Sequence, residues 1–171
     1  MNIELSEKKT RPEVFQKIER YLSAQGLVVA SKDFERPWGG FFVIDETQAE
    51  DFCSLFFPGL KVTDLHISGK LSPKILVVQP GKRLSWQYHH RRAEIWKLVA
   101  GSADVVTGTI EKEGPVQSLE LNQILRLTQG QCHRLVGASN WGVIAEIWQH
   151  TDPASPSDED DIIRLQDDFG R

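Results

Sequence analysis

The stretch at residues 81–101 constrains the fold of this chain most strongly, because it holds two runs of strand character joined by a polar bend. Its sequence is GKRLSWQYHHRRAEIWKLVAG. Side chains alternate between the two faces of a β-strand, so a strand over residues 83–89 places Gln87 and His89 on one face. If the second run returns as an antiparallel hairpin, Glu94 lies opposite His89. Gln87, His89 and Glu94 would then converge on one point, as the ligands of a metal ion must.

The chain from residue 73 onward alternates short apolar runs with polar and glycine-containing turns. Short strands joined by such turns are typical of an antiparallel sandwich or barrel, and we expect a jelly roll. The strands are expected at residues 75–79, 83–89, 94–100, 103–109, 116–121, 124–127, 133–136 and 141–149.

Two helices are expected before this region. Thr10 and Glu13 have the spacing of a capping box, which predicts a helix start, and Gly26 predicts its end. Thr47 and Glu50 form a second box of the same kind. We expect the first helix to pack on the main domain through its apolar face.

The composition excludes several classes of protein. The chain has 171 residues, of which 40% are hydrophobic, and this suits one globular domain with a full core. A formal charge of −4 argues against nucleic acid as a partner. Two cysteines, Cys53 and Cys132, are too few for a disulfide framework. No apolar run has the length of a membrane helix and the first residues are unlike a signal peptide, so we expect a cytoplasmic protein without membrane contact.

The spacing within the central stretch resembles the first sequence motif of the cupin superfamily, and the matching residues are Gly81, Gln87, His89, Glu94 and Gly101. Most cupins have a histidine where this chain has Gln87. The combination of this glutamine with the string from His89 to Glu94 resembles the sequence of the type II phosphomannose (mannose-6-phosphate) isomerases. That family includes the isomerase domain of the bifunctional guanylyltransferases. The chain departs from that family at Arg91, where the family usually has a third histidine. The resemblance implies an all-β fold, the cupin double-stranded β-helix (jelly-roll barrel), with a short helical N-terminal extension.

A second cupin motif is matched in spacing by Asn122, Thr128, Gly130 and His133, of which the glycine and the histidine agree in type. His133 is followed by Arg and Leu, as in the isomerase family.

The same resemblance extends to both ends of the presumed domain. Residues 36–39, Arg-Pro-Trp-Gly, resemble the start of the isomerase domain, and residues 160–171 resemble its C-terminal string. This implies an N-terminal helical extension over residues 1–35 and a cupin domain over residues 36–171. Within that domain, residues 46–73 are expected to be an insertion and residues 158–171 a docked tail.

The resemblance implies four metal ligands, Gln87, His89, Glu94 and His133. Two imidazoles, one carboxylate and one amide suit one divalent ion, with zinc as the first choice and Mn, Fe, Co or Ni as alternatives. Cupin dioxygenases typically use three histidines and a glutamate around iron, so Gln87 favours Lewis-acid chemistry over oxygen activation. The competing interpretation is a cupin whose polar pocket holds no metal.

Several residues are candidates for contact with a substrate. Arg92 and Glu94 are the candidate catalytic residues, and Arg83, Ser85, Arg92 and Arg164 are the candidate substrate-binding residues, since guanidinium groups bind phosphate bidentately. Arg171 is a weaker candidate from the tail. Glu146 is expected inside the barrel as an outer-shell group or proton carrier, and His66 is expected to pack or to face solvent. The general base cannot be named from the sequence.

Three functions compete at this point. The first is a metal-dependent aldose–ketose isomerase of carbohydrate metabolism that interconverts mannose 6-phosphate and fructose 6-phosphate. The second is a metal-containing cupin that binds a sugar or sugar phosphate without turnover. The third, a cupin dioxygenase, is disfavoured by Gln87. Cupins often pair through their sheets, so a homodimer is expected, with a small-molecule sugar phosphate as the partner.

Overall fold

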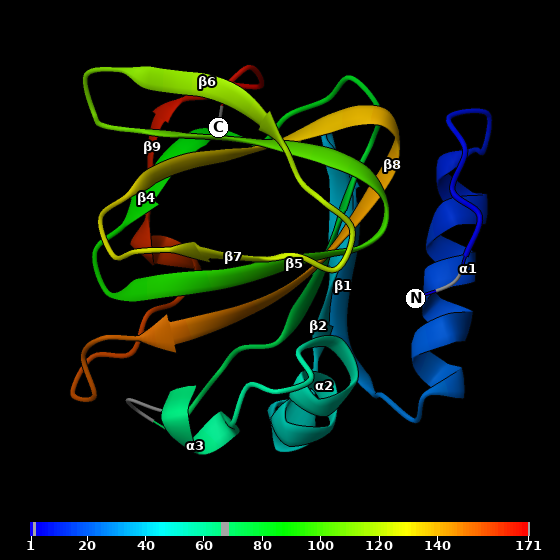
Figure 1. The fold of residues 1–171 in the computed structure, drawn as a ribbon, viewed down its shortest axis with the longest axis horizontal. Coiled ribbons are helices and arrows are strands. Elements are labelled where there is room, and N and C mark those ends of the chain that lie inside the picture. The colour runs from blue at the N-terminus through cyan, green and yellow to red at the C-terminus, as the bar shows by residue number, and fades with distance from the viewer. Residues whose placement is uncertain (2, 66–68, 171) are drawn as a thin grey trace.

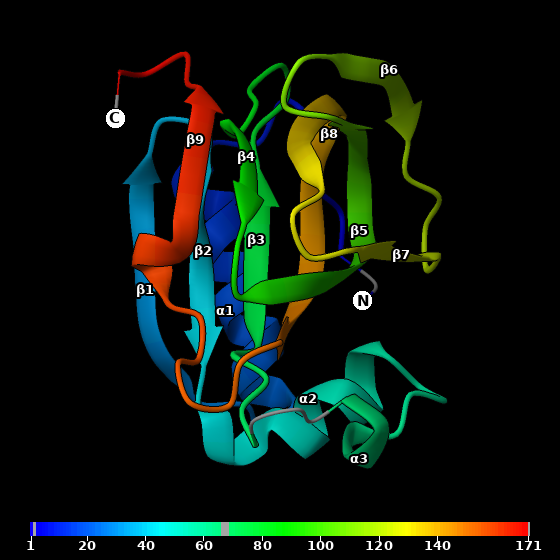
Figure 2. The ribbon, with the colours of Figure 1, turned by 90° about the vertical axis from the view of Figure 1, so that its left-hand side faces the viewer.

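The computed structural model describes residues 1, 3–65 and 69–170, which form a β-barrel with helices against its outside and at one end (Figures 1 and 2). The strands of this described part are β1 (Val29–Arg36), β2 (Gly39–Ile44), β3 (Lys74–Val78), β4 (Trp86–His89), β5 (Arg92–Gly108), β6 (Glu113–Ser118), β7 (Ile124–Leu127), β8 (Cys132–His150) and β9 (Ile162–Gln166). Its helices are α1 (Arg11–Ala24), α2 (Ala49–Phe56) and α3 (Val62–Leu65), with 3-10 turns at Glu46–Gln48 and Glu159–Asp161.

The barrel consists of two sheets that share the long strands β5 and β8. These two strands pair antiparallel from Arg92↔His150 to Gly108↔Cys132. The first sheet runs β1–β2–β3, then the second half of β8, the first half of β5, and β7. The second sheet runs β9–β4, then the first half of β8, the second half of β5, and β6. The predicted all-β jelly-roll architecture is confirmed.

The sequence analysis divided β5 and β8 into shorter strands, and this was wrong. Gly101 lies within β5 and does not end it. The residue takes a positive φ of 72°, and the pairing of β5 with β8 is irregular between Leu98 and Ala100 and between Gly101 and Ala103. A Cβ at this position would lie 1.7 Å from the Trp141 carbonyl oxygen, so only glycine permits the close approach. The strand therefore bends from one sheet into the other without breaking.

The predicted hairpin between the two runs of the central stretch is also wrong. β4 pairs with β8 and β9, with His89 opposite Ile162, whereas Glu94 on β5 lies opposite Trp148 and Leu127. The bend after His89 carries the chain from the second sheet to the first. His89 and Glu94 therefore approach one another across the barrel interior and not along a ladder.

Helix α1 lies against the outer face of the first sheet (Figure 1). The predicted capping box is confirmed, because the Thr10 N–H donates to the Glu13 carboxylate at 2.7 Å. Phe15 contacts Phe34 of β1 with a ring-centroid distance of 4.3 Å. Because β1 pairs with β2, residues before position 36 contribute both a helix and a strand to the core. None of the helices in the described part of the chain is long and apolar enough to cross a membrane.

The second predicted capping box does not form. The N–H and hydroxyl of Thr47 both donate to Asp45, at 2.9 and 2.6 Å, so Asp45 caps the 3-10 turn that precedes α2. Helix α2 buries Phe52 and Phe56 and lies below the strands at one end of the barrel (Figure 2). Both cysteines of the chain are buried and unpaired.

The C-terminal segment docks on the barrel through β9 and the turn before it. Within the turn, Asp161 is buried and accepts the N–H groups of His90 and Arg91 at 3.1 and 2.9 Å. The Ser157 hydroxyl also donates to the Asp161 carboxylate, at 2.7 Å. Strand β9 then pairs with β4. The acidic tail is thus tied to the bend that follows His89.

His150, at the end of β8, holds the start of this segment. The ring is 1% exposed, its Nδ1 accepts the Ser157 N–H at 2.9 Å, and its Nε2 lies 3.2 Å from the Ser72 hydroxyl. Burial and the charges of Lys70, Arg92 and Arg91 lower the pKa of His150 to about 4, although Asp161 opposes this shift. The imidazole is therefore neutral, and protonation at Nδ1 would break the bond to Ser157.

We predict that His150 makes the fold sensitive to acid. Its pKa is about 6.5 when unfolded and about 4 when folded, so its stabilisation is complete above pH 6.5 and is lost as the pH falls towards 4. Between these limits the free energy of unfolding should fall by roughly 3 kcal/mol on account of this residue. Urea unfolding of the wild type and of His150→Gln at pH 7.5 and pH 5 measures the difference. His90→Gln, at an exposed histidine, is the control, and equal pH dependence in all three proteins would contradict the prediction.

Candidate metal centre and active site

Three buried side chains meet inside the barrel: His89 of β4, Glu94 of β5 and His133 of β8. His89 Nε2 lies 3.1 Å from Glu94 Oε1, and His133 Nε2 lies 3.3 Å from Glu94 Oε2. One possible ligand atom from each residue lies within 4.8 Å of the others. The two histidines come from the second sheet and the glutamate from the first, so the cluster depends on closure of the barrel.

Backbone carbonyls set the tautomers of both histidines. His89 Nδ1 lies 3.1 Å from the Asp161 carbonyl oxygen, and His133 Nδ1 lies 2.9 Å from that of Gln131. A carbonyl oxygen only accepts, so each Nδ1 carries a proton and each ring turns its Nε2 towards the Glu94 carboxylate. His133 Nε2 is buried and has no hydrogen-bond partner in the described part of the chain.

Glu94 completes a donor set that fits a divalent metal. Burial alone would raise the pKa of Glu94, but interactions with His89, His133 and Arg92 hold it well below its usual range. The site therefore offers one ionised carboxylate and two imidazole nitrogens whose far sides are hydrogen-bonded. This is the usual protein environment of zinc and similar transition ions.

Gln87 faces the same interior from β4 but makes a different contact. Its Oε1 accepts a hydrogen bond from the Ser85 hydroxyl at 2.7 Å, and both residues line the cavity described below. In the ladder Gln87 lies between His133 on β8 and Arg164 on β9. A role for Gln87 as a fourth ligand stays a prediction.

Arg92 lies beside the cluster and is almost fully buried. Its Nε donates to Glu94 Oε1 at 2.8 Å, and its Nη2 donates to His89 Nε2 at 3.3 Å. On the other side, Nη1 donates to the Ser157 hydroxyl and the Asp158 carbonyl at 2.9 and 3.0 Å. The guanidinium stacks 3.6 Å from the centroid of the Trp148 ring. These contacts place a fixed positive charge next to Glu94.

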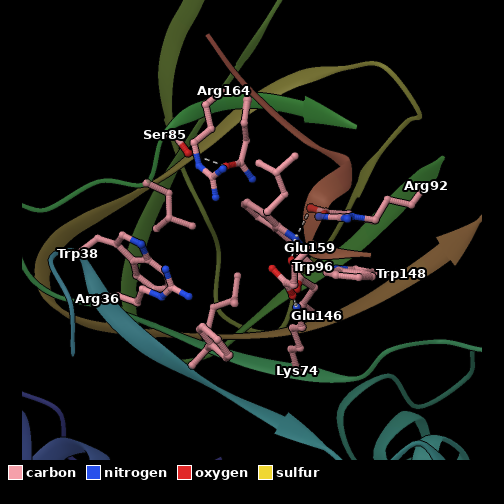
Figure 3. Close-up of a pocket in the computed structure, with 16 residues that line it drawn as sticks. Arg36, Trp38, Lys74, Ser85, Arg92, Trp96, Glu146, Trp148, Glu159 and Arg164 are labelled. Carbon is pink, nitrogen blue, oxygen red and sulfur yellow. Dashed lines mark hydrogen bonds and ion pairs between the residues drawn. The ribbon is translucent and has the colours of Figure 1, made fainter. Parts of the chain in front are cut away.

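A cavity of about 80 Å³ adjoins Glu94 and Arg92 inside the barrel (Figure 3). Glu146 of β8 forms part of its wall and is buried. The Trp96 indole N–H reaches both Glu146, at 2.9 Å, and Glu94, at 3.1 Å. Burial and the charge of Glu94 raise the pKa of Glu146 to about 7, although Lys74 and Arg92 oppose the shift. The cavity wall therefore contains a carboxyl group that can hold or release a proton near neutral pH.

The structure brings Ser85 and Arg164 to this cavity but not Arg83. Strand β4 begins only at Trp86, so the alternation expected from residue 83 does not hold there. Arg83 is partly exposed and forms an ion pair with Asp168, with two contacts of 2.6 and 2.8 Å. Arg171 and His66, which were considered from the sequence, lie outside the described residues.

Arg91, on the bend after His89, points away from the cluster. Its guanidinium donates to the Ser155 hydroxyl, the Pro156 carbonyl and the Asp158 carboxylate at 2.9, 3.0 and 2.9 Å. The residue at which the chain departs from the isomerase family thus contacts the C-terminal segment.

Sequence reasoning missed two kinds of contributor. The first kind is a set of side chains that line the cavity, namely Lys74, Arg36 and Trp148. Lys74 could have been noticed in the sequence, because it is a charged residue at the start of the apolar run 74–78. The carbonyls that orient the two histidines left no signal at all, because any residue type supplies a carbonyl oxygen.

Comparison with known protein families gives a match over most of the chain. The family described as mannose-6-phosphate isomerase C-terminal matches residues 46–167. These residues include all of the cluster and the Glu146 carboxyl group.

Curated relatives include two bacterial biosynthesis proteins and a guanylyltransferase. The alginate biosynthesis protein AlgA of Pseudomonas aeruginosa is 32% identical over 73% of this chain and 24% of its own length. The xanthan biosynthesis protein XanB of Xanthomonas campestris is 32% identical over 80% of this chain and 23% of its own. A mannose-1-phosphate guanylyltransferase of Escherichia coli is 32% identical over 68% of this chain and 23% of its own length. The chain spans about a quarter of the length of these relatives.

Solved structures with a similar fold include proteins of very different kinds. The capsular polysaccharide assembling protein CapF of Staphylococcus aureus has a TM-score of 0.51 at 14% identity, covering 82% of this chain and 34% of its own. Oxalate decarboxylase of Lactobacillus farciminis has a TM-score of 0.53 at 14% identity, and the match covers 80% of this chain and 34% of the decarboxylase chain. At this identity the likeness shows the cupin fold alone.

We predict that removing either imidazole abolishes metal binding. His89→Ala and His133→Ala should each weaken zinc affinity by more than about 100-fold, because even outer-shell partners of a ligand contribute about 10–100-fold. Metal analysis after dialysis measures the loss, and circular dichroism checks the fold. His90→Ala is the matched control, because His90 adjoins His89 in sequence but is exposed. Full metal content in both cluster variants would rule out this centre.

Proposed function

Because this chain belongs to the mannose-6-phosphate isomerase C-terminal family, we propose that it is a metal-dependent aldose–ketose isomerase of sugar phosphates. The proposed reaction interconverts mannose 6-phosphate and fructose 6-phosphate. The observation that supports it best is the buried cluster of His89, Glu94 and His133, with the Nε2 atoms of both histidines directed to the carboxylate. We propose Gln87 as the fourth ligand and zinc as the ion, with Mn, Fe, Co and Ni as alternatives.

The chemistry requires stabilisation of a developing oxyanion. An aldose–ketose isomerase moves a proton between two neighbouring carbons through an enediol, and negative charge grows on the carbonyl oxygen. A divalent ion, when bound, supplies Lewis-acid polarisation of that oxygen. Arg92 supplies a second positive charge, which Trp148 and the turn at Ser157 hold in place before the reaction. Glu94 would serve both as a ligand and as the anchor of Arg92.

Glu146 is our candidate for the group that moves the proton. It lines the same cavity as Arg92 and Glu94, and no lysine or arginine forms an ion pair with it in the described part of the chain. A carboxyl group with a pKa near the operating pH is suited to both removal and return of a proton. The charge of a bound ion would lower that pKa, which keeps the ionised base available at neutral pH.

The second candidate function is a cupin that binds a sugar phosphate without turnover. One observation favours it over turnover: every nitrogen of the Arg92 guanidinium is already engaged by protein groups. Turnover then depends on whether a ligand can enter without displacing Arg92. The cytoplasmic location, the homodimer and the domain division at residue 35 stay predictions.

We predict metal-dependent interconversion of mannose 6-phosphate and fructose 6-phosphate by the purified protein. A chelator should abolish the activity and added divalent ion should restore it. Arg92→Ala should lower kcat and kcat/KM together by about 100-fold, the effect of removing one charge-stabilising donor, while the metal is retained. Arg92→Lys, which keeps the charge, separates this effect from a loss of packing. Metal-loaded protein that binds the sugar phosphate but converts none of it would favour the second function.

We predict that Glu146→Gln lowers kcat by about 100-fold or more without loss of metal, because the isosteric amide cannot accept the proton. In the wild type, kcat/KM should rise with pH through an inflection at or below about 7, where the carboxyl group ionises. That inflection should vanish in the variant. Glu120→Gln, at an exposed glutamate, controls for the charge change. An unchanged pH profile in Glu146→Gln would assign proton transfer to another group.

A further inference from the structure

A groove of about 710 Å³ adjoins the cavity on the side of β1 and β2. Arg36, Lys74, Glu159 and Arg164 line both spaces, so they lie where the two meet. We propose that Arg36 and Arg164, with Ser85 beside them, form a phosphate-binding subsite at this junction. The proposal rests on the proposed function and names the residues that would select a phosphorylated sugar.

Arg164 contributes an inward-facing guanidinium to the junction. It lies on β9 directly opposite Gln87 of β4, which turns it to the inner face of the second sheet. Two other cations of the cavity lining have carboxylate partners, because Lys74 pairs with Glu159 and Arg92 pairs with Glu94. Arg164 has no hydrogen bond or ion pair within the described residues. An unpaired guanidinium at a cavity mouth is free to bind an anion.

Arg36 contributes the second guanidinium, and helix α1 fixes its backbone. Arg11 of that helix donates to the carbonyls of Phe34 and Arg36 at 2.8 and 2.9 Å, which holds the end of β1. The Arg36 guanidinium lies 5.5 Å from the centroid of the Phe41 ring. Its Nε is buried and lies 2.8 Å from Asp33 without forming a hydrogen bond, so this ion pair is poorly directed. An aligned bond at that distance would satisfy the nitrogen.

The two arginines face the reacting groups across the cavity. Figure 3 shows Arg36 and Arg164 on one side, and Arg92, Trp148 and Glu146 on the other. A ligand with an anion at one end and a carbonyl at the other could therefore contact both sides at once. Phosphate oxygens match the planar fork of a guanidinium, and two such forks distinguish a sugar phosphate from the free sugar. The Ser85 hydroxyl, which now donates to Gln87, is a further polar group on the side of Arg164.

Titration calorimetry of the metal-loaded protein with inorganic phosphate, mannose 6-phosphate and mannose tests the subsite. Arg36→Gln and Arg164→Gln should each weaken binding of both phosphate-containing ligands by about tenfold or more, because each removes charge-assisted hydrogen bonds. The double variant should bind mannose 6-phosphate no better than mannose. Arg126→Gln, at an exposed arginine of β7, is the matched control and should bind as the wild type does. Arg36→Lys and Arg164→Lys, which keep the charge, check that a loss is not due to misfolding.

The outcomes separate this proposal from the isomerase itself. Wild-type affinity for mannose 6-phosphate in both glutamine variants would overturn the subsite, even if the protein is an active isomerase. Failure of the wild type to bind either phosphate compound would overturn it as well. Loss of phosphate affinity in both variants, in a protein that converts no hexose phosphate, would support the subsite and count against the isomerase.

Discussion

The antiparallel pairing of β5 with β8 is the interaction on which the rest of this molecule depends. Both strands bend through the barrel and belong to both sheets. The register of this one ladder therefore fixes how the residues of the first sheet lie relative to those of the second. The same ladder sets Glu94 opposite Trp148 and Trp96 opposite Glu146, which aligns two carboxylates and two indoles on the inner face. Further along it, His133 lies opposite Thr107. A shift of one residue would turn all of these side chains out of the barrel.

The C-terminal segment contributes chemistry as well as a strand. The Asp161 carbonyl orients His89, its carboxylate holds the bend after His89, and Ser157 fixes Arg92. Each contact acts on a group beside the metal cluster without itself offering a ligand. Such outer-shell contacts determine which nitrogen of a histidine faces the ion and how firmly it is held. The segment from Ser157 to Asp161 is therefore best regarded as part of the site.

Two carboxylates beside the cavity have ion-pair partners, whereas a third carboxyl group has none within the described residues. Arg92 pairs with Glu94 and Lys74 with Glu159, but Glu146 accepts a hydrogen bond from Trp96. A buried carboxyl group near another negative charge is costly to ionise, and this raises its pKa into the neutral range. The cavity can therefore combine a fixed positive charge with a group that exchanges protons.

Local properties of the sequence determined the strand character of residues 75–149, the capped helix at Thr10 and the candidate residues of the cluster, because alternation, capping and motif spacing act over a few positions. The tertiary structure alone decided how those residues meet. Glu94 reaches His89 across the barrel because the bend changes sheets, whereas a local hairpin was the only partner visible from spacing. The tautomers of His89 and His133 and the raised pKa of Glu146 were likewise decided by the fold. They depend on carbonyls, burial and charges from distant parts of the chain, and short-range sequence patterns do not encode these distances.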